Sequence, residues 1–195
     1  MFFEQKTMAV APFHLGRVHV QQGDCALTDF ESACAPLVAT WVKDVRELFW
    51  LAPKTIPPLT ADKVIGWPGP HGRPLLFWQL GRAEPTGYAE LNPMPGNSAH
   101  LWIGHCLIRP DARGAGLGHR IVQLLIEEAF SRHRAPAVSL VVFPENSPAV
   151  RCYRANGFVH VREQVRFLPT TGRTYCMIEM RITRDDYTKN RTAAG

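Results

Sequence analysis

The sequence predicts a single α/β (α+β) domain with a central sheet of about seven strands and about four flanking helices. A glycine-rich turn, Arg113-Gly114-Ala115-Gly116-Leu117-Gly118, joins an apolar strand-like run to a long helical stretch. A valine-rich run, Ala137–Phe143, follows that helix. The 195 residues are 46% hydrophobic, which is enough apolar material for one good core. The order strand, turn, helix and buried strand therefore indicates the fold class.

The N-terminal part predicts one strand and three helical segments. Arg17–Gln22 alternates apolar and polar residues, which is typical of a strand. Thr28-Asp29-Phe30-Glu31 has the spacing of a capping box, so we expect a helix to begin there. Ala39–Leu51 carries apolar residues on one side and predicts a second helix that stops before Pro53. After a proline-rich loop, Thr60 is placed to cap a short helical turn that ends at Trp67.

The middle of the chain predicts three strands and the longest helix. Pro74–Leu80 and Gly87–Leu91 are apolar runs separated by a polar turn. Leu101–Ile108 is the next strand. Apolar residues recur at helical spacing over Gly116–Arg132, on so much of the surface that we expect this helix to be largely buried.

The C-terminal part predicts a buried strand, a short helix and a final pair of strands. The continuous apolar run Ala137–Phe143 is typical of a strand covered on both faces. Pro148–Asn156 is a short helix, and Gly157 is its C-cap. Val161–Leu168 and Thr174–Ile182 are two strands around a turn.

These elements define the expected domain boundaries. We expect an N-terminal extension over residues 1–15, one domain over residues 16–184, and a polar C-terminal tail over residues 185–195 that is frayed. Residues 1–15 are too polar for a signal peptide, and no stretch approaches the about 18 apolar residues of a membrane span. We therefore expect a cytoplasmic chain without a membrane partner, either a monomer or a homodimer.

The cysteine pattern predicts reduced thiols and no metal site. The five cysteines are odd in number and widely spread, and no Cys-x-x-Cys pair occurs. Their positions are Cys25, Cys34, Cys106, Cys152 and Cys176. Neither a disulfide framework nor a metal cluster follows from this spacing.

The net charge of +5 is compatible with a nucleic acid or with a small anion. Charged residues make up only 20% of the chain, and no aromatic-basic block or recognition-helix pattern occurs, so nucleic acid is not the favoured partner. Several arginines flank the glycine-rich turn and the later short helix: Arg109, Arg113, Arg120, Arg151 and Arg154. Their placement favours neutralisation of a phosphate, most of all by Arg113.

The glycine-rich turn is a candidate cradle for that phosphate. Small residues let successive backbone N–H groups point at an anion on a helix N-terminus. A Walker loop requires Gly-Lys-Ser/Thr at the end of the turn, whereas this chain has Gly118-His119-Arg120. A dinucleotide fold requires Gly-x-Gly-x-x-Gly and an acidic residue about 20 residues on, and both are missing. A structural turn without a ligand is the remaining alternative.

Two motifs that follow one another along the chain resemble those of the GNAT superfamily of acetyl-CoA-dependent N-acetyltransferases. The first is Arg113-Gly-x-Gly116-x-Gly118, and the second is Asn146-x-x-Ala-x-x-x-Tyr153-x-x-x-Gly157-Phe158. The resemblance covers residues 87–160 most firmly. It implies the GNAT fold, a mixed, mostly antiparallel twisted sheet whose splayed central strands hold acetyl-CoA. It also implies an acyltransferase in which an amine attacks the thioester directly.

The resemblance also implies roles for individual residues. Backbone amides would hold the pyrophosphate of coenzyme A, and the strand before them would bind the pantetheine arm through its backbone. The amides are those of Arg113, Gly114, Ala115, Gly116, Leu117, Gly118 and His119, and the strand residues are Cys106, Leu107 and Ile108. Asn146 would contact the cofactor, cap its helix, or do both. Tyr153 would protonate the departing thiolate.

The general base is where the sequence departs from the family. Val141 stands where some relatives have a glutamate, and His100 stands where others have one. His100 is the first candidate base, with Glu90 and His105 as rivals and a water chain as a further alternative. The amine acceptor is unknown. The missing glutamate also keeps open a second hypothesis, an acyl-CoA-binding regulatory module of the same fold without turnover.

Overall fold

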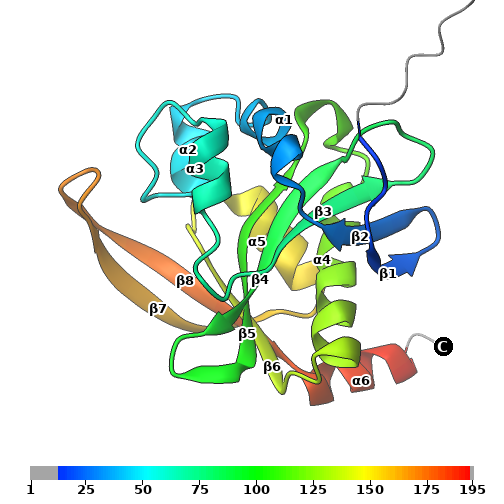
Figure 1. Cartoon of the computed structure of the whole chain (residues 1–195). Coiled ribbons are helices and arrows are strands. Elements are labelled where there is room, and N and C mark those ends of the chain that lie inside the picture. Colours follow the sequence, from blue (N-terminus) through cyan, green and yellow to red (C-terminus); the bar gives the residue numbers. More distant parts are fainter. Residues whose placement is uncertain (1–12, 194–195) are drawn as a thin grey trace, which may run out of the picture.

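The computed structural model describes residues 13–193 and contains one mixed sheet in the order β1-β2-β3-β4-β5-β6-β8-β7 (Figure 1). Within the described range, only β5 and β6 pair in parallel. The strands are β1 (Val18–Gln22), β2 (Cys25–Asp29), β3 (Pro74–Gln79), β4 (Gly87–Met94), β5 (Asn97–Ile108), β6 (Ala137–Val142), β7 (Val159–Leu168) and β8 (Arg173–Thr183). A mixed, mostly antiparallel sheet is thus confirmed. Most of the expected N-terminal extension, residues 1–12, and residues 194–195 lie outside the described range.

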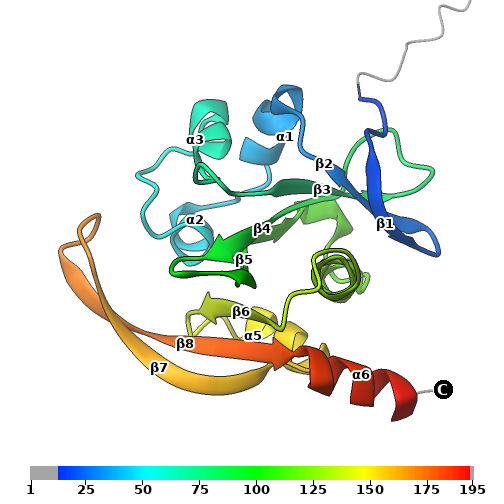
Figure 2. The same ribbon diagram turned by 60° about the horizontal axis from the view of Figure 1, so that its bottom comes forward.

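The helices lie on both faces of this sheet. They are α1 (Ala35–Ala39), α2 (Val45–Leu51), α3 (Ala61–Gly66), α4 (Leu117–Glu127), α5 (Ser147–Ala155) and α6 (Arg184–Ala193), with a π-helical turn at Glu128–Arg132. Figure 2 shows α1 to α3 on one side of β3, β4 and β5, and α4 on the other side. The sheet therefore lies between α4 and the helices α1 to α3.

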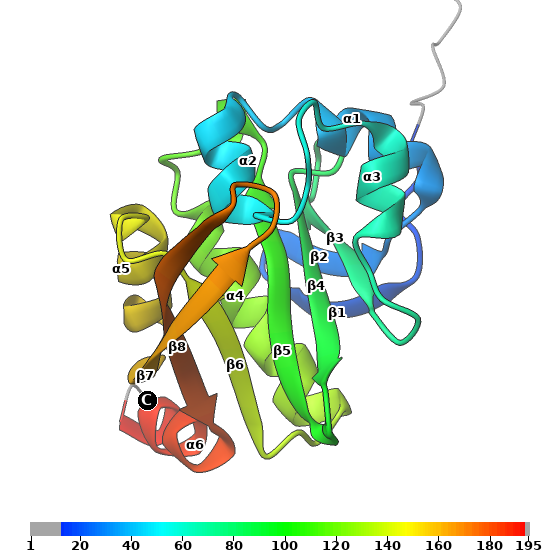
Figure 3. The same ribbon diagram turned by 90° about the vertical axis from the view of Figure 1, so that its left-hand side faces the viewer.

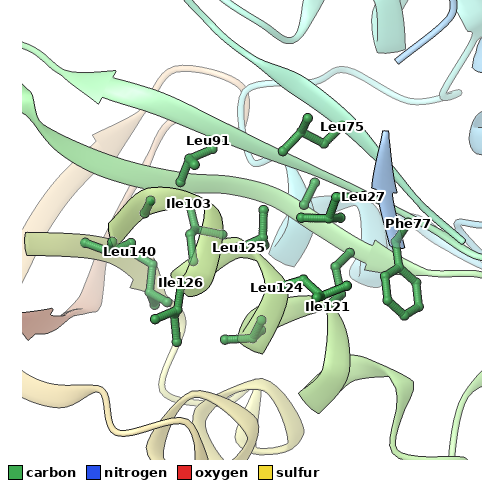
Figure 4. Packing of buried hydrophobic residues seen from close by; sticks show 14 of the residues in the cluster. Leu27, Leu75, Phe77, Leu91, Ile103, Ile121, Leu124, Leu125, Ile126 and Leu140 are labelled. Atoms are coloured by element: carbon green, nitrogen blue, oxygen red, sulfur yellow. The ribbon is translucent and has the colours of Figure 1, made fainter. Parts of the chain in front are cut away.

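Each face of the sheet has its own core. The larger core joins α4 to β2–β6, and Ile121, Leu124 and Leu125 of α4 are almost completely buried in it (Figure 4). The smaller core joins α1 and α3 to the opposite face, where Tyr88 is fully buried. Consecutive strand residues point to opposite faces, so β4 contributes Ala89 and Leu91 to one core and Tyr88 to the other. Both faces of the central strands are therefore covered.

The prediction that a helix begins at a capping box at Thr28 is wrong. Thr28 lies within β2, where its Oγ1 accepts a hydrogen bond of 3.0 Å from Trp78 Nε1 on β3. Strand β2, which the sequence did not reveal, pairs with β1 and β3, and its Cys25, Ala26 and Leu27 are buried. Cross-strand pairing and burial outweigh the local capping signal, so the first helical turn begins only at Ser32.

The helix expected over Ala39–Leu51 begins later than predicted. Helix α1 ends at Ala39, and α2 begins at Val45 with Asp44 as its N-cap. The Asp44 side chain accepts a hydrogen bond of 2.7 Å from the Glu47 N–H, which satisfies one amide of the first turn of α2. An N-cap inside the apolar-periodic segment therefore sets the start of α2.

The C-terminal residues form a helix where the sequence predicts a frayed end. Helix α6 packs on the π-helical turn, with the Tyr187 ring centroid 5.1 Å from that of Phe130. The Tyr187 hydroxyl donates to Glu127, and the Arg184 guanidinium donates to the Ala135 carbonyl over 3.0 Å. These contacts hold a polar segment that has little apolar periodicity of its own. No helix in the described part of the chain is long and apolar enough to cross a membrane.

Strands β5 and β6 pair over a very short length. Their partners are Leu101 with Val138 and Trp102 with Ser139, near the start of β6, and beyond these residues the two strands separate. Figure 3 shows β4, β5 and β6 with α2 above them. The edge of β5 that faces β6 is therefore free of sheet hydrogen bonds at its C-terminal end. This splay, expected from the resemblance, opens the sheet next to the start of α4.

Candidate active site

A cavity of about 890 Å³ occupies the space between the separated strands. Its walls come from the ends of β5 and β6, the glycine-rich turn at the start of α4, one side of α5, and α2. Of the residues that the sequence predicts as binding or catalytic, those in its wall are His105, Cys106, Leu107, Ile108, Arg113, Gly114, Gly116, Gly118, His119, Asn146 and Tyr153. The structure thus brings together two motifs that are separated in the sequence.

The glycine-rich turn presents unpaired backbone donors. Gly114 and Gly116 have φ angles of 81° and 78°, values that favour glycine. Within the described residues, the N–H groups of Gly114, Ala115 and Gly116 make no backbone hydrogen bond. Gly116 is the N-cap of α4 and has no side chain to occupy the first turn. These amides and the positive end of the helix dipole form a site for an anion.

The other residues of the predicted cradle differ in their access to the cavity. Leu117 is 6% exposed and packs in the core, so only its amide is available to a ligand. Ala115 is exposed and lies outside the cavity wall. His119 lines the wall, and its Nδ1 is 2.9 Å from Asn156 Nδ2 at the end of α5. This contact links the start of α4 to α5.

The Arg113 side chain is not free to neutralise a phosphate. Its Nε donates to the Ile108 carbonyl over 2.8 Å, its Nη2 donates to the Trp41 carbonyl over 2.9 Å, and its Nη1 pairs with Glu47. The guanidinium instead ties the glycine-rich turn to the α1–α2 region. The expectation that Arg113 neutralises phosphate through its side chain is therefore corrected, whereas its amide remains at the turn.

Two further arginines of the predicted cluster also have protein partners. Arg109 pairs with Asp111 and Glu84, and Arg120 donates to the Gln22 carbonyl over 3.0 Å. Arg151 on α5 lines the cavity and is exposed. Of these side chains, Arg151 is therefore the one best placed to meet a negative charge in the cavity.

The β5 end of the wall provides backbone groups and an unreactive thiol. Leu107 and Ile108 pair with β4 on one side, and their other side faces the separation from β6. Burial raises the pKa of the Cys106 thiol to about 12, with a further contribution from Cys152. The thiol therefore stays protonated at neutral pH, which argues against Cys106 as a nucleophile.

Asn146 at the N-terminus of α5 and Tyr153 within α5 both line the cavity. Asn146 is the N-cap of α5, and its Oδ1 accepts a hydrogen bond of 3.4 Å from the Ala149 N–H. Asn146 therefore has the capping function and also lines the cavity. Tyr153 packs its ring against Phe158, and burial raises its pKa well above the ordinary value of 10.0. Its hydroxyl is thus a hydrogen-bond donor at neutral pH.

The three candidate bases differ in their access to the cavity. His100 lies outside the cavity wall, and its Nε2 is 2.9 Å from Ser139 Oγ. Burial and the nearby Arg181 lower the pKa of His100, and Glu179 acts in the opposite sense. Glu90 is 1% exposed beneath the wall, whereas His105 lines the wall itself. Of the three, His105 is the one that the structure brings into the cavity with Tyr153.

No sequence motif marks the α2 side of the cavity. Lys43, Arg46, Trp50 and Leu51 line it, and the Arg46 guanidinium lies 4.5 Å from the centroid of the Trp50 ring. Three tryptophans of the N-terminal half lie in different surroundings. Trp50 lines the cavity, Trp41 is buried in the core, and Trp67 stacks on His105. No local motif marks these residues, because tertiary packing alone brings α2 over the strands.

Across the described residues, no group of three or more His, Cys, Asp or Glu side chains is arranged to hold a metal ion.

Comparisons with known proteins agree with this geometry. Residues 41–158 match the acetyltransferase (GNAT) family. The fold is similar to that of a spermidine N-acetyltransferase from Vibrio cholerae in complex with CoA and spermine, with a TM-score of 0.70 and 18% identity over 85% of this chain and 98% of that chain. It is also similar to an aminoglycoside acetyltransferase in complex with coenzyme A, with a TM-score of 0.67 and 20% identity over 86% of this chain and 99% of that chain.

Proposed function

This chain belongs to the acetyltransferase (GNAT) family, whose members are acyltransferases that use acetyl-CoA, and on this premise we propose that it transfers the acetyl group to a primary amine. The amine attacks the thioester carbonyl directly, without a covalent enzyme intermediate. The raised thiol pKa of Cys106 supports direct transfer, because a protonated thiol is a poor nucleophile.

One observation carries the proposal most strongly. The unpaired amides at the start of α4 and the Tyr153 side chain line one continuous cavity, which follows the splay of β5 and β6. A cofactor with its pyrophosphate on these amides could extend its arm along the free edge of β5 toward Tyr153, as an added strand does. Burial raises the pKa of Tyr153 and keeps its phenol protonated, so the hydroxyl has a proton to donate when a thiolate departs.

The charges of the cavity wall bear on the acceptor. Its carboxylates, among the described residues, are Asp44 and Glu47. Asp44 caps α2, and Glu47 accepts the Lys43 N–H and pairs with Arg113. Both carboxylates therefore already have partners within the protein.

The cations and apolar groups of the same wall also disfavour an acceptor with several positive charges. Lys43, Arg46 and Arg151 add positive charge, while Trp50 and Leu51 add apolar surface. We infer that the acceptor has one amine on an apolar or anionic body. Polyamines and aminoglycosides, which carry several ammonium groups, meet no free carboxylate on this wall and are expected to be poor acceptors.

The proposal is tested by calorimetric titration with acetyl-CoA followed by thiol release across a panel of amines. We expect binding of acetyl-CoA, and thiol release that is faster with phenylethylamine than with spermidine or kanamycin. A chain that binds acetyl-CoA without thiol release from any amine would support the binding-module alternative instead. Absence of acetyl-CoA binding would overturn both hypotheses. Faster turnover of the polycations would overturn only the acceptor inference.

A further inference from the structure

We propose that His105 is the base that deprotonates the acceptor and that the buried Glu90 is a positioning residue that holds its imidazole. The proposal rests on the proposed acetyl transfer and names the group that activates the amine. His105 lies on β5 and Glu90 on the neighbouring strand β4, and a β-bulge between these strands brings the two side chains into contact.

A β-bulge turns His105 toward Glu90. Tyr88 pairs with Leu107 and Glu90 pairs with Gly104, so β5 has one residue more than β4 between these pairs. By regular alternation His105 would share the face of Ile103, which packs in the core beneath α4. The extra residue redirects its side chain to the opposite face, and His105 has a φ of 41° there. A non-glycine residue in this conformation is strained, which is frequent at functional sites.

Gly104 leaves room for the carboxylate. A Cβ atom at this position would lie 3.2 Å from Glu90 Oε2 and 3.3 Å from Asn92 Nδ2. A larger residue would therefore press on the carboxylate and on its amide partner. The bulge and the glycine together create the space in which Glu90 and His105 meet.

Glu90 is held as an anion by three donors. Its Oε1 accepts from the Tyr88 hydroxyl and from His105 Nδ1, both at 2.8 Å, and its Oε2 accepts from Asn92 Nδ2 at 2.8 Å. Burial alone would raise the pKa of Glu90, but the hydrogen bonds from His105, Asn92 and Tyr88 outweigh burial and lower it. An ionised carboxylate can only accept, so Nδ1 carries the proton of the neutral imidazole. The lone pair of that imidazole is then on Nε2.

Trp67 fixes the plane of the imidazole. The two rings are stacked with their centroids 4.6 Å apart and an interplanar angle of 9°. Trp67 is itself held by a hydrogen bond of 2.9 Å from its Nε1 to Thr55 Oγ1. His105 remains 23% exposed and lines the cavity, and no hydrogen bond forms at Nε2 within the described residues. The ring is therefore oriented by Glu90 and Trp67 while one nitrogen stays available.

The proton steps balance as follows. Nε2 of His105 takes one proton from the acceptor ammonium, and the neutral amine attacks the thioester carbonyl carbon. The carbon–nitrogen bond forms, the carbon–sulfur bond breaks, and the nitrogen loses a second proton to solvent. The departing thiolate receives a proton from Tyr153, which solvent restores, and the imidazolium returns its proton to solvent. The products are the amide, coenzyme A as the thiol, and one net proton.

His105→Gly with added imidazole is the decisive variant. Glycine suits the φ of 41°, and the removed ring leaves space beside Trp67. We expect turnover to fall by about 10²- to 10⁴-fold, acetyl-CoA affinity to stay unchanged, and free imidazole to restore part of the rate. Arg134→Gly is the matched control, because Arg134 has a φ of 50° and lies outside the cavity wall. Unchanged turnover in His105→Gly, or a loss that imidazole does not restore, would overturn the proposal.

Glu90→Gln separates positioning from folding. Without the carboxylate the imidazole loses the acceptor that orients it, so we expect kcat to fall while the Kd for acetyl-CoA stays unchanged. Glu90→Asp should retain more activity than Glu90→Gln. A folded Glu90→Gln chain with an unchanged kcat contradicts the positioning role. If the wild-type chain itself releases no thiol with any amine, the proposed function fails, and that outcome is distinct from an active chain that does not need His105.

Discussion

Gly116→Ala tests whether the backbone at the start of α4 binds the cofactor. Gly116 has a φ of 78°, and a Cβ atom there would meet no atom within 4 Å. Alanine in this left-handed conformation costs about 1–2 kcal/mol. The protein offers no steric obstacle, so the loss of stability has its origin in the backbone alone. For a chain of this size the melting temperature should fall by about 2–8 °C.

The effect on acetyl-CoA binding is separate from that strain. A new methyl group at the N-cap projects beside the free amides, and any relaxation of φ turns the following N–H groups away from the anion. A hydrogen bond to a charged group contributes about 1.5–3 kcal/mol. Loss of one such bond therefore raises the Kd for acetyl-CoA by about 10- to 100-fold.

Gly96→Ala is the matched control for this substitution. Gly96 has a φ of 77° and is equally free of neighbours within 4 Å, but it lies in the turn between β4 and β5. Thermal denaturation should show the same loss in both variants, and calorimetric titration should show weaker acetyl-CoA binding only in Gly116→Ala. Equal affinities in the two variants would refute the assignment of the cofactor amides.

Three further predictions concern other parts of the molecule. Tyr153→Phe should slow turnover with acetyl-CoA affinity retained in calorimetry; unchanged turnover would exclude the phenol as proton donor. Arg113→Lys keeps the charge but cannot contact two carbonyls and Glu47 at once, so both the melting temperature and acetyl-CoA affinity should fall. Burial alone would raise the pKa of Glu179, but hydrogen bonds from Arg162 and two other side chains lower it below 4.5. The ionised carboxylate therefore contributes its full stabilisation of the fold above pH 4.5, and this contribution is lost as the pH falls through the lowered pKa. Urea unfolding of Glu179→Gln should therefore be less sensitive to pH below 4.5 than that of the wild-type chain, and an equal pH sensitivity would contradict this linkage.

The parts of the fold that the sequence predicts well are governed by local signals. Helices α4 and α5 have strong apolar periodicity or a capping asparagine, and Gly157, predicted as the C-cap of α5, follows the C-cap Asn156 with a φ of 87°. Each of these features depends on residues only a few positions apart. The glycine-rich turn is equally local, so its place at the start of α4 follows from the sequence alone.

Features that need distant partners could not be predicted in the same way. Strand β2 exists because β1 and β3 pair on either side of it, and this pairing overrides the capping signal at Thr28. Arg113 appears in the sequence as a phosphate ligand, yet its side chain is occupied by Trp41 and Glu47 from far upstream. Such partners become visible only when the strands are in register.

The candidate base shows the same limit at the level of a single residue. His100, Glu90 and His105 are all present in the expected strands, and spacing favours none of them decisively. The bulge between β4 and β5 decides, because one extra residue places His105 over Glu90 and in the cavity wall, whereas His100 lies against Ser139. A bulge is a property of two paired strands, so neither strand alone predicts it.

The two halves of the cavity are therefore built by different physical means. The proposed donor half consists of backbone amides, whose direction depends on φ angles at Gly114 and Gly116 rather than on side chains. The proposed acceptor half consists of side chains from α2 and β5, among them Trp50 and His105, which tertiary packing brings together. Because Glu90 and Trp67 orient the imidazole from outside the cavity wall, the residues that contact the acceptor are free to differ without moving the proposed base. Binding of acetyl-CoA through backbone amides is thus compatible with an acceptor unlike those of structurally similar proteins.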